Sequence, residues 1–489
     1  MNRRTRLTIF LSLSVLFLLV APLAVFYSLG WRFDWKTKKI TQPGIFYFKV
    51  WPKNVEIYLN GNLEEKTDFF FSSTLVENLL PGNYNIEIKK EGFHSWKKTL
   101  KIEKRQATEV KNIVLIPENP SFIVITKEIE DLFFSPDNEK IILKNKSNLD
   151  LEKQSWSLKL FELKKNVKSH LIDEKDISEK KVHLIDLKFS PDSKRVLLKV
   201  ETEEQLMYYL LEIDTTPAVL TYLFHSVENP QSQNDLDDFL DPNNIKEIHF
   251  DPENSQKLFI LLVPTEETGE GGGELYEVYL TDQKISPTPL KNIIACSVSN
   301  SDIYYLDSSG FLFKTDNSFK QQERLNMIPF PLTEKAEYKI TVSNYNISLE
   351  ENDILYIFDR NKKSFQKLLE PAKNFRLSPD SRKMLYFNDH EIWVLFLEYQ
   401  HEQPQKESGE KLFITRFSEK IDEVFWYTNH YLIFNTGDKI KVAEIDDRDR
   451  INIVELVEFK ESKLFWNLSD KKLYILIGET LFSSEKIAP

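Results

Sequence analysis

Histidines and a single cysteine are the side chains best able to do acid–base, nucleophilic or transition-metal chemistry in this chain of 489 residues. The cysteine, Cys296, can form neither an internal disulfide nor a cysteine-based zinc cluster. We expect it to be a buried, small apolar side chain rather than a nucleophile. The histidines are His94, His170, His183, His225, His249, His390, His401 and His430. No two of them have the spacing of metal ligands, so the sequence predicts no catalytic, cofactor-binding or metal-binding residues.

Three charged or glycine-rich segments could be taken for ligand-binding motifs, but each has a simpler interpretation. Residues 268–273 resemble a phosphate loop but lack its lysine, so we expect a hairpin tip. Residues 234–241 carry carboxylates that could hold Ca²⁺, but their spacing is not that of an EF-hand, which favours a solvated loop. Residues 446–450 are most simply a charged turn. The G-x-S-x-G and H-E-x-x-H motifs of hydrolases are absent from the sequence.

Composition excludes several classes of protein. The chain is 41% hydrophobic and 29% charged, which is typical of a globular protein. It has 64 basic and 76 acidic residues, a net charge of −12, so no nucleic-acid partner is expected. The length fits about three domains.

A charge-free run covers residues 7–29, after a short tail (residues 1–6) with three arginines. About 20 apolar residues cross a bilayer as a helix, and cleaved signal peptides usually have a shorter apolar region. We therefore expect a retained transmembrane anchor, which makes the membrane one partner. The basic tail favours a cytoplasmic N-terminus with the bulk of the chain outside. Basic residues also follow the run at 32–39, so the basic residues on its two sides are nearly balanced in number.

Residues 44–117 alternate apolar and polar side chains around three turns. The turns are Asn60-Gly61, Pro81-Gly82-Asn83 and Glu91-Gly92-Phe93, and Asn-Gly is a strong hairpin signal. The pattern predicts a small sandwich of short antiparallel strands.

At these residues the chain resembles the PEGA domain family. The resemblance rests on Pro52, the hairpin at residues 55–61, Leu79 before residues 81–84, and residues 91–93 with Trp96. The tetrapeptide that names the family is replaced by Pro52-Lys53-Asn54-Val55, and Asp68 follows Thr67 where the family tends to have proline. The resemblance implies a surface-exposed β module without catalytic groups, close to a membrane or a bacterial cell envelope.

A repeated turn marks residues 121–489. Its copies are Phe134-Ser135-Pro136-Asp137, Phe189-Ser190-Pro191-Asp192 and Leu377-Ser378-Pro379-Asp380, with decayed copies at 250–253 and 468–470. Proline presets φ in a tight turn, while serine and aspartate bond to the local backbone. Each copy is followed by an apolar run, so it predicts a strand–turn–strand unit.

The spacing of the copies gives eight units of about 46 residues, or seven if one cryptic unit is false. The region resembles WD40-like and TolB-type β-propellers, although the Trp-Asp dipeptide is absent. Phe122–Thr126 would supply the missing strand of the last unit and close the ring. The predicted fold is all-β: a transmembrane helix, a PEGA-like sandwich and a propeller. Two stacked β-sandwiches are the competing architecture.

These features favour a membrane-anchored, extracytoplasmic binding or scaffold protein that is not an enzyme. Its propeller would recognise a protein, a peptide or a cell-envelope glycan. The alternative is a propeller enzyme, a lyase or hydrolase of envelope polysaccharide, with an acid and a base from different blades at the ring axis. In a third interpretation, the ring only stiffens an envelope assembly.

Overall fold

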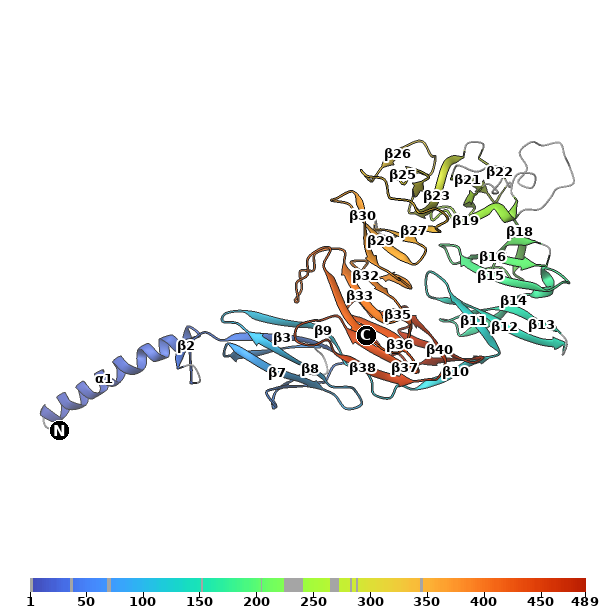
Figure 1. Cartoon of the computed structure of the whole chain (residues 1–489). Helices are drawn as coiled ribbons and strands as arrows, with labels where there is room; N and C mark the ends of the chain where they lie inside the picture. The colour runs from blue at the N-terminus through green and yellow to red at the C-terminus, as the bar shows by residue number, and fades with distance from the viewer. Residues whose placement is uncertain are drawn as a thin grey trace.

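One helix and a long series of strands make up the computed structural model (Figure 1). The structure describes residues 3–35, 38–67, 72–150, 153–203, 205–223, 241–263, 272–281, 284–286, 289–343 and 346–489. The segments 234–240 and 268–271, discussed above, and His225 lie outside the described residues.

Helix α1 (Arg3–Ser28) contains the charge-free run. Its apolar side chains are exposed along its whole length, with Leu18 69% and Phe17 70% exposed. It is long and apolar enough to cross a membrane, and a signal sequence would have the same character. A short hairpin of β1 (Arg32–Asp34) and β2 (Lys39–Thr41) follows it.

Two sheets that share one core follow the hairpin, and we call them the small β unit. One sheet has the order β6 (Ser73–Leu79), β3 (Gly44–Trp51), β9 (Ala107–Val114); the other has the order β5 (Asn62–Lys66), β4 (Glu56–Leu59), β7 (Gly82–Lys89), β8 (Trp96–Ile102). Phe46, Ile57 and Ile88 lie in the core between them. The Asn60-Gly61 turn joins β4 to β5, with φ of 52° and 86°. The predicted antiparallel pairing does not hold for β9, which pairs parallel to β3 after the chain has built the other sheet.

The rest of the chain forms antiparallel sheets in sequence order, which we call the ring. The first two are β11 (Ile129–Phe134), β12 (Lys140–Asp150), β13 (Lys153–Glu162), β14 (Val167–Asp173), and β15 (Val182–Phe189), β16 (Arg195–Thr202), β17 (Leu206–Glu212), β18 (Val219–Tyr222). Next comes an eight-stranded sheet of β19 (Ile245–Phe250), β20 (Lys257–Leu262), β21 (Gly273–Tyr279), β22 (Lys284–Ile285), β23 (Leu290–Ser299), β24 (Asp302–Asp307), β25 (Leu312–Asp316) and β26 (Gln322–Arg324). Short 3₁₀ turns η1 (Glu174–Asp176) and η2 (Pro242–Asn244) lie before β15 and β19.

Four more four-stranded sheets complete the ring. They are β27 (Tyr338–Ser343), β28 (Asn346–Glu351), β29 (Ile354–Asp359), β30 (Ser364–Leu369); β31 (Asn374–Leu377), β32 (Lys383–Phe387), β33 (Glu391–Phe396), β34 (Lys411–Arg416); β35 (Ile421–Thr428), β36 (Tyr431–Thr436), β37 (Lys439–Glu444), β38 (Ile453–Glu458); and β39 (Ser462–Asn467), β40 (Lys472–Ile477), β41 (Thr480–Ser484), β10 (Phe122–Lys127). The predicted pairing of residues 122–126 with the C-terminal strands is confirmed, because β10 pairs with β41.

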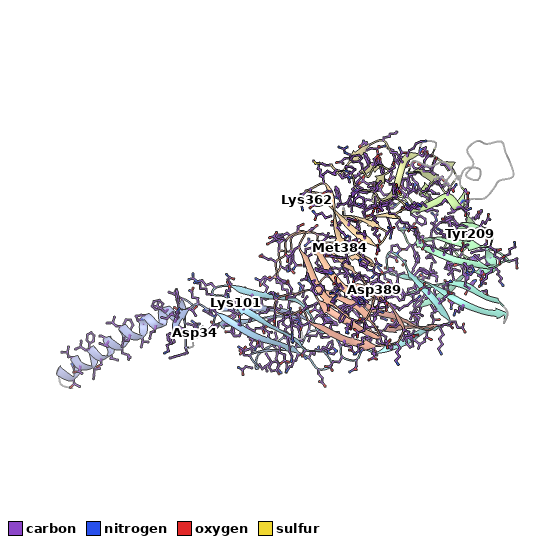
Figure 2. All side chains as sticks on the ribbon, viewed as in Figure 1. Asp34, Lys101, Tyr209, Lys362, Met384 and Asp389 are labelled. Atoms are coloured by element: carbon purple, nitrogen blue, oxygen red, sulfur yellow. The ribbon has the colours of Figure 1, made fainter. Side chains whose placement is uncertain are left out.

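Apolar side chains fill the spaces between consecutive sheets, for example around Met384 (Figure 2). A single sheet cannot bury both of its apolar faces by itself, whereas neighbouring sheets on either side cover them. One such cluster joins the last two sheets through Ile433 and Ile475. Another joins the last sheet to the first through Leu476 and Ile141. This order of packing is that of a β-propeller, so the all-β, propeller-like prediction is confirmed, and stacked sandwiches do not account for it.

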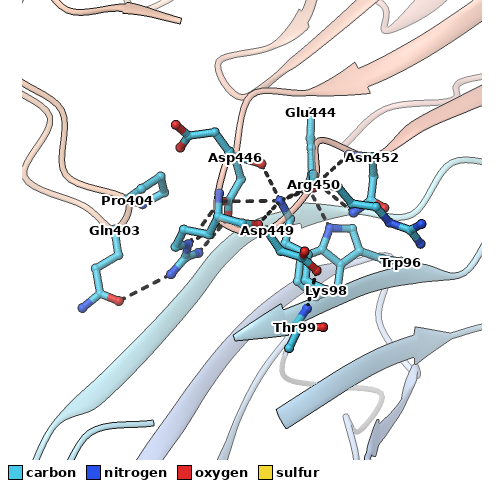
Figure 3. Close-up of polar contacts among 12 residues, drawn as sticks. Trp96, Lys98, Thr99, Gln403, Pro404, Glu444, Asp446, Asp449, Arg450 and Asn452 are labelled. Atoms are coloured by element: carbon cyan, nitrogen blue, oxygen red, sulfur yellow. Dashed lines mark hydrogen bonds and ion pairs between the residues drawn. The ribbon is translucent and has the colours of Figure 1, made fainter. Parts of the chain in front are cut away.

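The small β unit contacts the ring through a buried polar network (Figure 3). The Lys98 side chain is fully buried, and its Nζ lies 2.9 Å from the Glu444 carboxylate. The same Nζ donates to the backbone carbonyls of Asp446, Arg448 and Arg450. Residues 446–450 are therefore more than a charged turn, because their backbone carbonyls bind the Lys98 ammonium group of the small β unit.

Candidate binding site on the inner strands

A hollow of about 520 Å³ opens where β11, β15, β19 and β23 lie next to one another. β11, β15 and β19 are each the first strand of their sheet, and β23 belongs to the same sheet as β19. The hollow lies at the ends of these strands where the repeated turns begin. Its lining consists of Phe133, Phe134, Pro136, Leu187, Lys188, Phe189, Pro191, Ile248, His249, Phe250, Pro252 and Val298.

The repeated turn itself builds the rim of this hollow. The aromatic residue before each turn lines it in three successive units, as Phe134, Phe189 and Phe250. The proline of each turn lines it as well, and all three prolines are exposed. Aromatic rings and prolines with few polar neighbours suit an apolar or proline-containing ligand segment. The sequence predicted these residues as parts of strand–turn–strand units and not as a binding surface, although their recurrence at one position of the unit was the signal for a shared surface.

The serine and aspartate of the repeated turn hold two of the three rim turns in place, those at residues 134–137 and 189–192. In the second copy, the Ser190 hydroxyl donates to the Asp192 carboxylate over 2.6 Å and accepts from the Arg195 backbone N–H over 2.9 Å. The Ser135 and Ser378 hydroxyls make the same contacts in their own copies. The predicted function of the motif as a backbone-bonded turn is confirmed.

Two titratable side chains, Lys188 and His249, are among those lining the hollow. The Lys188 side chain is 52% exposed and lies 3.8 Å from the Asp186 carboxylate. His249 Nε2 lies 2.8 Å from Glu247 Oε2. The lining residues of the described part of the chain include no carboxylate, so the acid and base of a glycoside hydrolase are not gathered here.

Glu247, His249 and Cys296 meet beside the hollow. Cys296 is fully buried, as predicted, and its Sγ lies 3.8 Å from Glu247 Oε2. Burial, aided by the negative charge of Glu247, raises the pKa of the Cys296 thiol well above its ordinary value. A protonated, buried thiol is a poor nucleophile, which agrees with the expectation for this residue.

The structure does not bring the other described histidines into the hollow. His170 lies 3.5 Å from Asp173 on an exposed edge. His430 is partly buried beside a small cavity, of about 30 Å³, between the ring and the small β unit. The polar side chains Trp96, Glu444 and Asp446 also line that cavity.

Comparison with known proteins finds only remote structural similarity. No protein family and no curated protein sequence matches the chain. Among solved structures, the computationally designed Ika8 protein is 10% identical with a TM-score of 0.43, over 73% of this chain and 96% of that one. The β-propeller domain of Myceliophteria thermophila Cps50 (Swd1) is 12% identical with a TM-score of 0.37, over 76% and 99%. KlHsv2 with loop 6CD replaced by a Gly-Ser linker is 10% identical with a TM-score of 0.38, over 68% and 99%.

Proposed function

We propose that this chain is a membrane-anchored, non-enzymatic binding protein whose ring captures an extended segment of a partner protein in the hollow. The observation that carries the proposal is the threefold use of one motif to line a single hollow with phenylalanine and proline. Such a surface gains free energy by burying apolar groups, about 25 cal/mol per Å² removed from water. The exposed ammonium of Lys188 would add attraction for a carboxylate on the same segment.

The parts of the chain have distinct functions in this proposal. Residues 7–29 anchor it in the membrane, with residues 1–6 in the cytoplasm. Residues 44–117 form a PEGA-like spacer, supported by the shared core of its two sheets. Residues 121–489 form an eight-bladed propeller, in which the eight-stranded sheet counts as two blades because β21 touches β23 at only a few residues.

Site-specific photocrosslinking in intact cells tests the binding proposal. A photoreactive amino acid replaces Phe189 in the hollow or, as a matched control, Ile185, an exposed residue of the same strand that does not line it. We expect one discrete crosslinked protein from position 189 and none from position 185. That product should be lost when Phe134 is also changed to alanine. Equal labelling at both positions, or a product that survives Phe134→Ala, would argue against the hollow as the binding site.

Protease added to intact cells tests the proposed orientation. If the ring is extracytoplasmic, it should be cut at exposed loops while a cytoplasmic marker stays whole. Full protection of the ring until the membrane is opened would reverse the orientation and leave the binding proposal untouched.

A further inference from the structure

Glu247, His249 and Cys296 form a cluster that neither the anchor nor the apolar rim requires. In the part of the chain that the structure describes, two groups of three metal-capable side chains have their ligand atoms within 4.8 Å of one another. This group is one of them. The other, His170, Asp173 and Asp176, is largely exposed and lies within a short stretch of the chain.

The cluster joins two strands that are distant in sequence. β19 supplies Glu247 and His249, and β23 supplies Cys296. The Nε2–Oε2 distance is 2.8 Å and the Sγ–Oε2 distance is 3.8 Å. Ligands placed tetrahedrally at the usual zinc bond lengths are about 3.3–3.5 Å apart. The Sγ–Oε2 distance is already close to this range, the Nε2–Oε2 distance would have to lengthen by about half an ångström, and all three ligand atoms lie within 4.8 Å of one another.

Burial leaves one side of the cluster open. Cys296 is fully buried, whereas the side chains of Glu247 and His249 are 16% and 26% exposed. His249 also lines the hollow, so a fourth ligand position would face it. Three protein ligands and one open position are typical of zinc sites that bind an exchangeable water or ligand.

The donor chemistry selects a transition metal. Thiolate and imidazole favour Zn²⁺ and its neighbours, whereas Ca²⁺ and Mg²⁺ prefer oxygen alone. When the metal binds, the Cys296 thiol loses its proton to solvent and a metal–sulfur bond forms. The Glu247 carboxylate and the Cys296 thiolate then balance the two positive charges of the ion, so the occupied site is neutral.

We propose that Glu247, His249 and Cys296 bind Zn²⁺ or a similar divalent transition metal, with the open position facing the hollow. The proposal does not depend on the hollow binding a partner. It also departs from the expectation of no metal ligands, because the sequence separates Glu247 from Cys296 by 49 positions.

Cobalt binding tests this site directly. The full chain in detergent is stripped with a chelator under reducing conditions and titrated with Co²⁺. We expect a single equivalent to bind with a near-ultraviolet thiolate-to-cobalt charge-transfer band, and Zn²⁺ to displace it. Absence of the band would overturn the proposal.

Variants identify the ligands. Cys296→Ser should abolish the band, while His249→Gln and Glu247→Gln should each weaken Co²⁺ binding by about tenfold or more. His170→Gln, in the exposed group, is the control and should change nothing. Because the His249 side chain is partly exposed, we expect His249→Gln to fold, so this variant decides the question even if Cys296→Ser does not fold. Wild-type affinity and an unchanged band in His249→Gln would contradict the site.

Discussion

At the scale of single residues, one hydroxyl fixes each repeated turn. The Ser190 side chain is fully buried and is the acceptor for the Arg195 N–H. Without it, this backbone donor would be buried without a partner. The turn therefore depends on this hydrogen bond in addition to the fixed φ of its proline.

Ser190→Ala should lower the free energy of unfolding by about 1–3 kcal/mol, the cost of an unsatisfied buried donor. Chemical denaturation measures the change, and faster hydrogen exchange at the Arg195 amide locates it. Ser418→Ala is the control, because Ser418 is exposed and bonds only to its neighbour Glu419. Equal effects of the two changes would show that the hydroxyl does not hold the turn.

His430 makes the contact between the ring and the small β unit sensitive to pH. Burial, aided by the positive charge of Lys383, lowers the pKa of His430 from 6.5 to about 4. The unfolded chain therefore takes up this proton first as the pH falls. Stability contributed by neutral His430 is present above pH 6.5 and is lost between pH 6.5 and about 4.

The His430→Gln variant should lose less stability than the wild type over that pH interval, by about 3 kcal/mol at most. Urea denaturation at pH 7.5 and pH 4.5 measures the difference. Identical pH profiles for the two proteins would mean that His430 titrates normally in the folded chain.

At the scale of elements, strand β8 connects the small β unit to the ring. Lys98 makes no contact with water, and its positive charge is met by Glu444 and by three carbonyl groups. Trp96, on the same strand, donates from Nε1 to Glu444 Oε2 over 2.8 Å. Burial raises the pKa of Glu444, and its bonds to Lys98 and Trp96 oppose that shift. Because the buried Lys98 ammonium and Glu444 carboxylate both have hydrogen-bond partners, this contact holds the small β unit and the ring in one orientation.

Lys98→Met should cost about 3–5 kcal/mol, because Glu444 is left as a buried, unpaired charge. Lys101→Met, on the same strand, removes an exposed pair with Glu103 and should cost less than 1 kcal/mol. Denaturation of both variants gives the comparison. Adding Glu444→Gln to Lys98→Met should recover part of the loss, and strictly additive losses would contradict the pairing.

Elements with a local signal could be predicted from the sequence. The Asn60-Gly61 hairpin, the three Ser-Pro-Asp turns and the closing strand at residues 122–127 all depend on neighbours in the chain or on repetition. The Lys98 contact depends on side chains more than 300 positions apart, and the Glu247–Cys296 contact joins two side chains 49 positions apart. Neither has a periodic or local pattern, so only the packed fold brings them together.

At the scale of the whole molecule, the helix, the small β unit and the ring follow one another along the chain (Figure 1). The exposed apolar surface of α1 has the character of a membrane anchor or a signal sequence. The ring needs closure, because an open end would expose both an apolar sheet face and an unpaired edge. The pairing of β10 with β41 supplies that closure from the N-terminal side.

If α1 is a retained anchor, the chain should stay in the membrane fraction after an alkaline carbonate wash. Intact mass spectrometry of the purified protein should then include residues 3–28. A soluble protein that begins after residue 29 would identify the helix as a cleaved signal sequence.

Electron cryomicroscopy of the full chain in lipid nanodiscs tests the closed ring most directly. The account predicts eight radial sheets around one axis, with β10 beside β41 and the three Phe–Pro turns facing a common hollow. Sheets stacked in pairs, or a ring left open between β10 and β41, would contradict it.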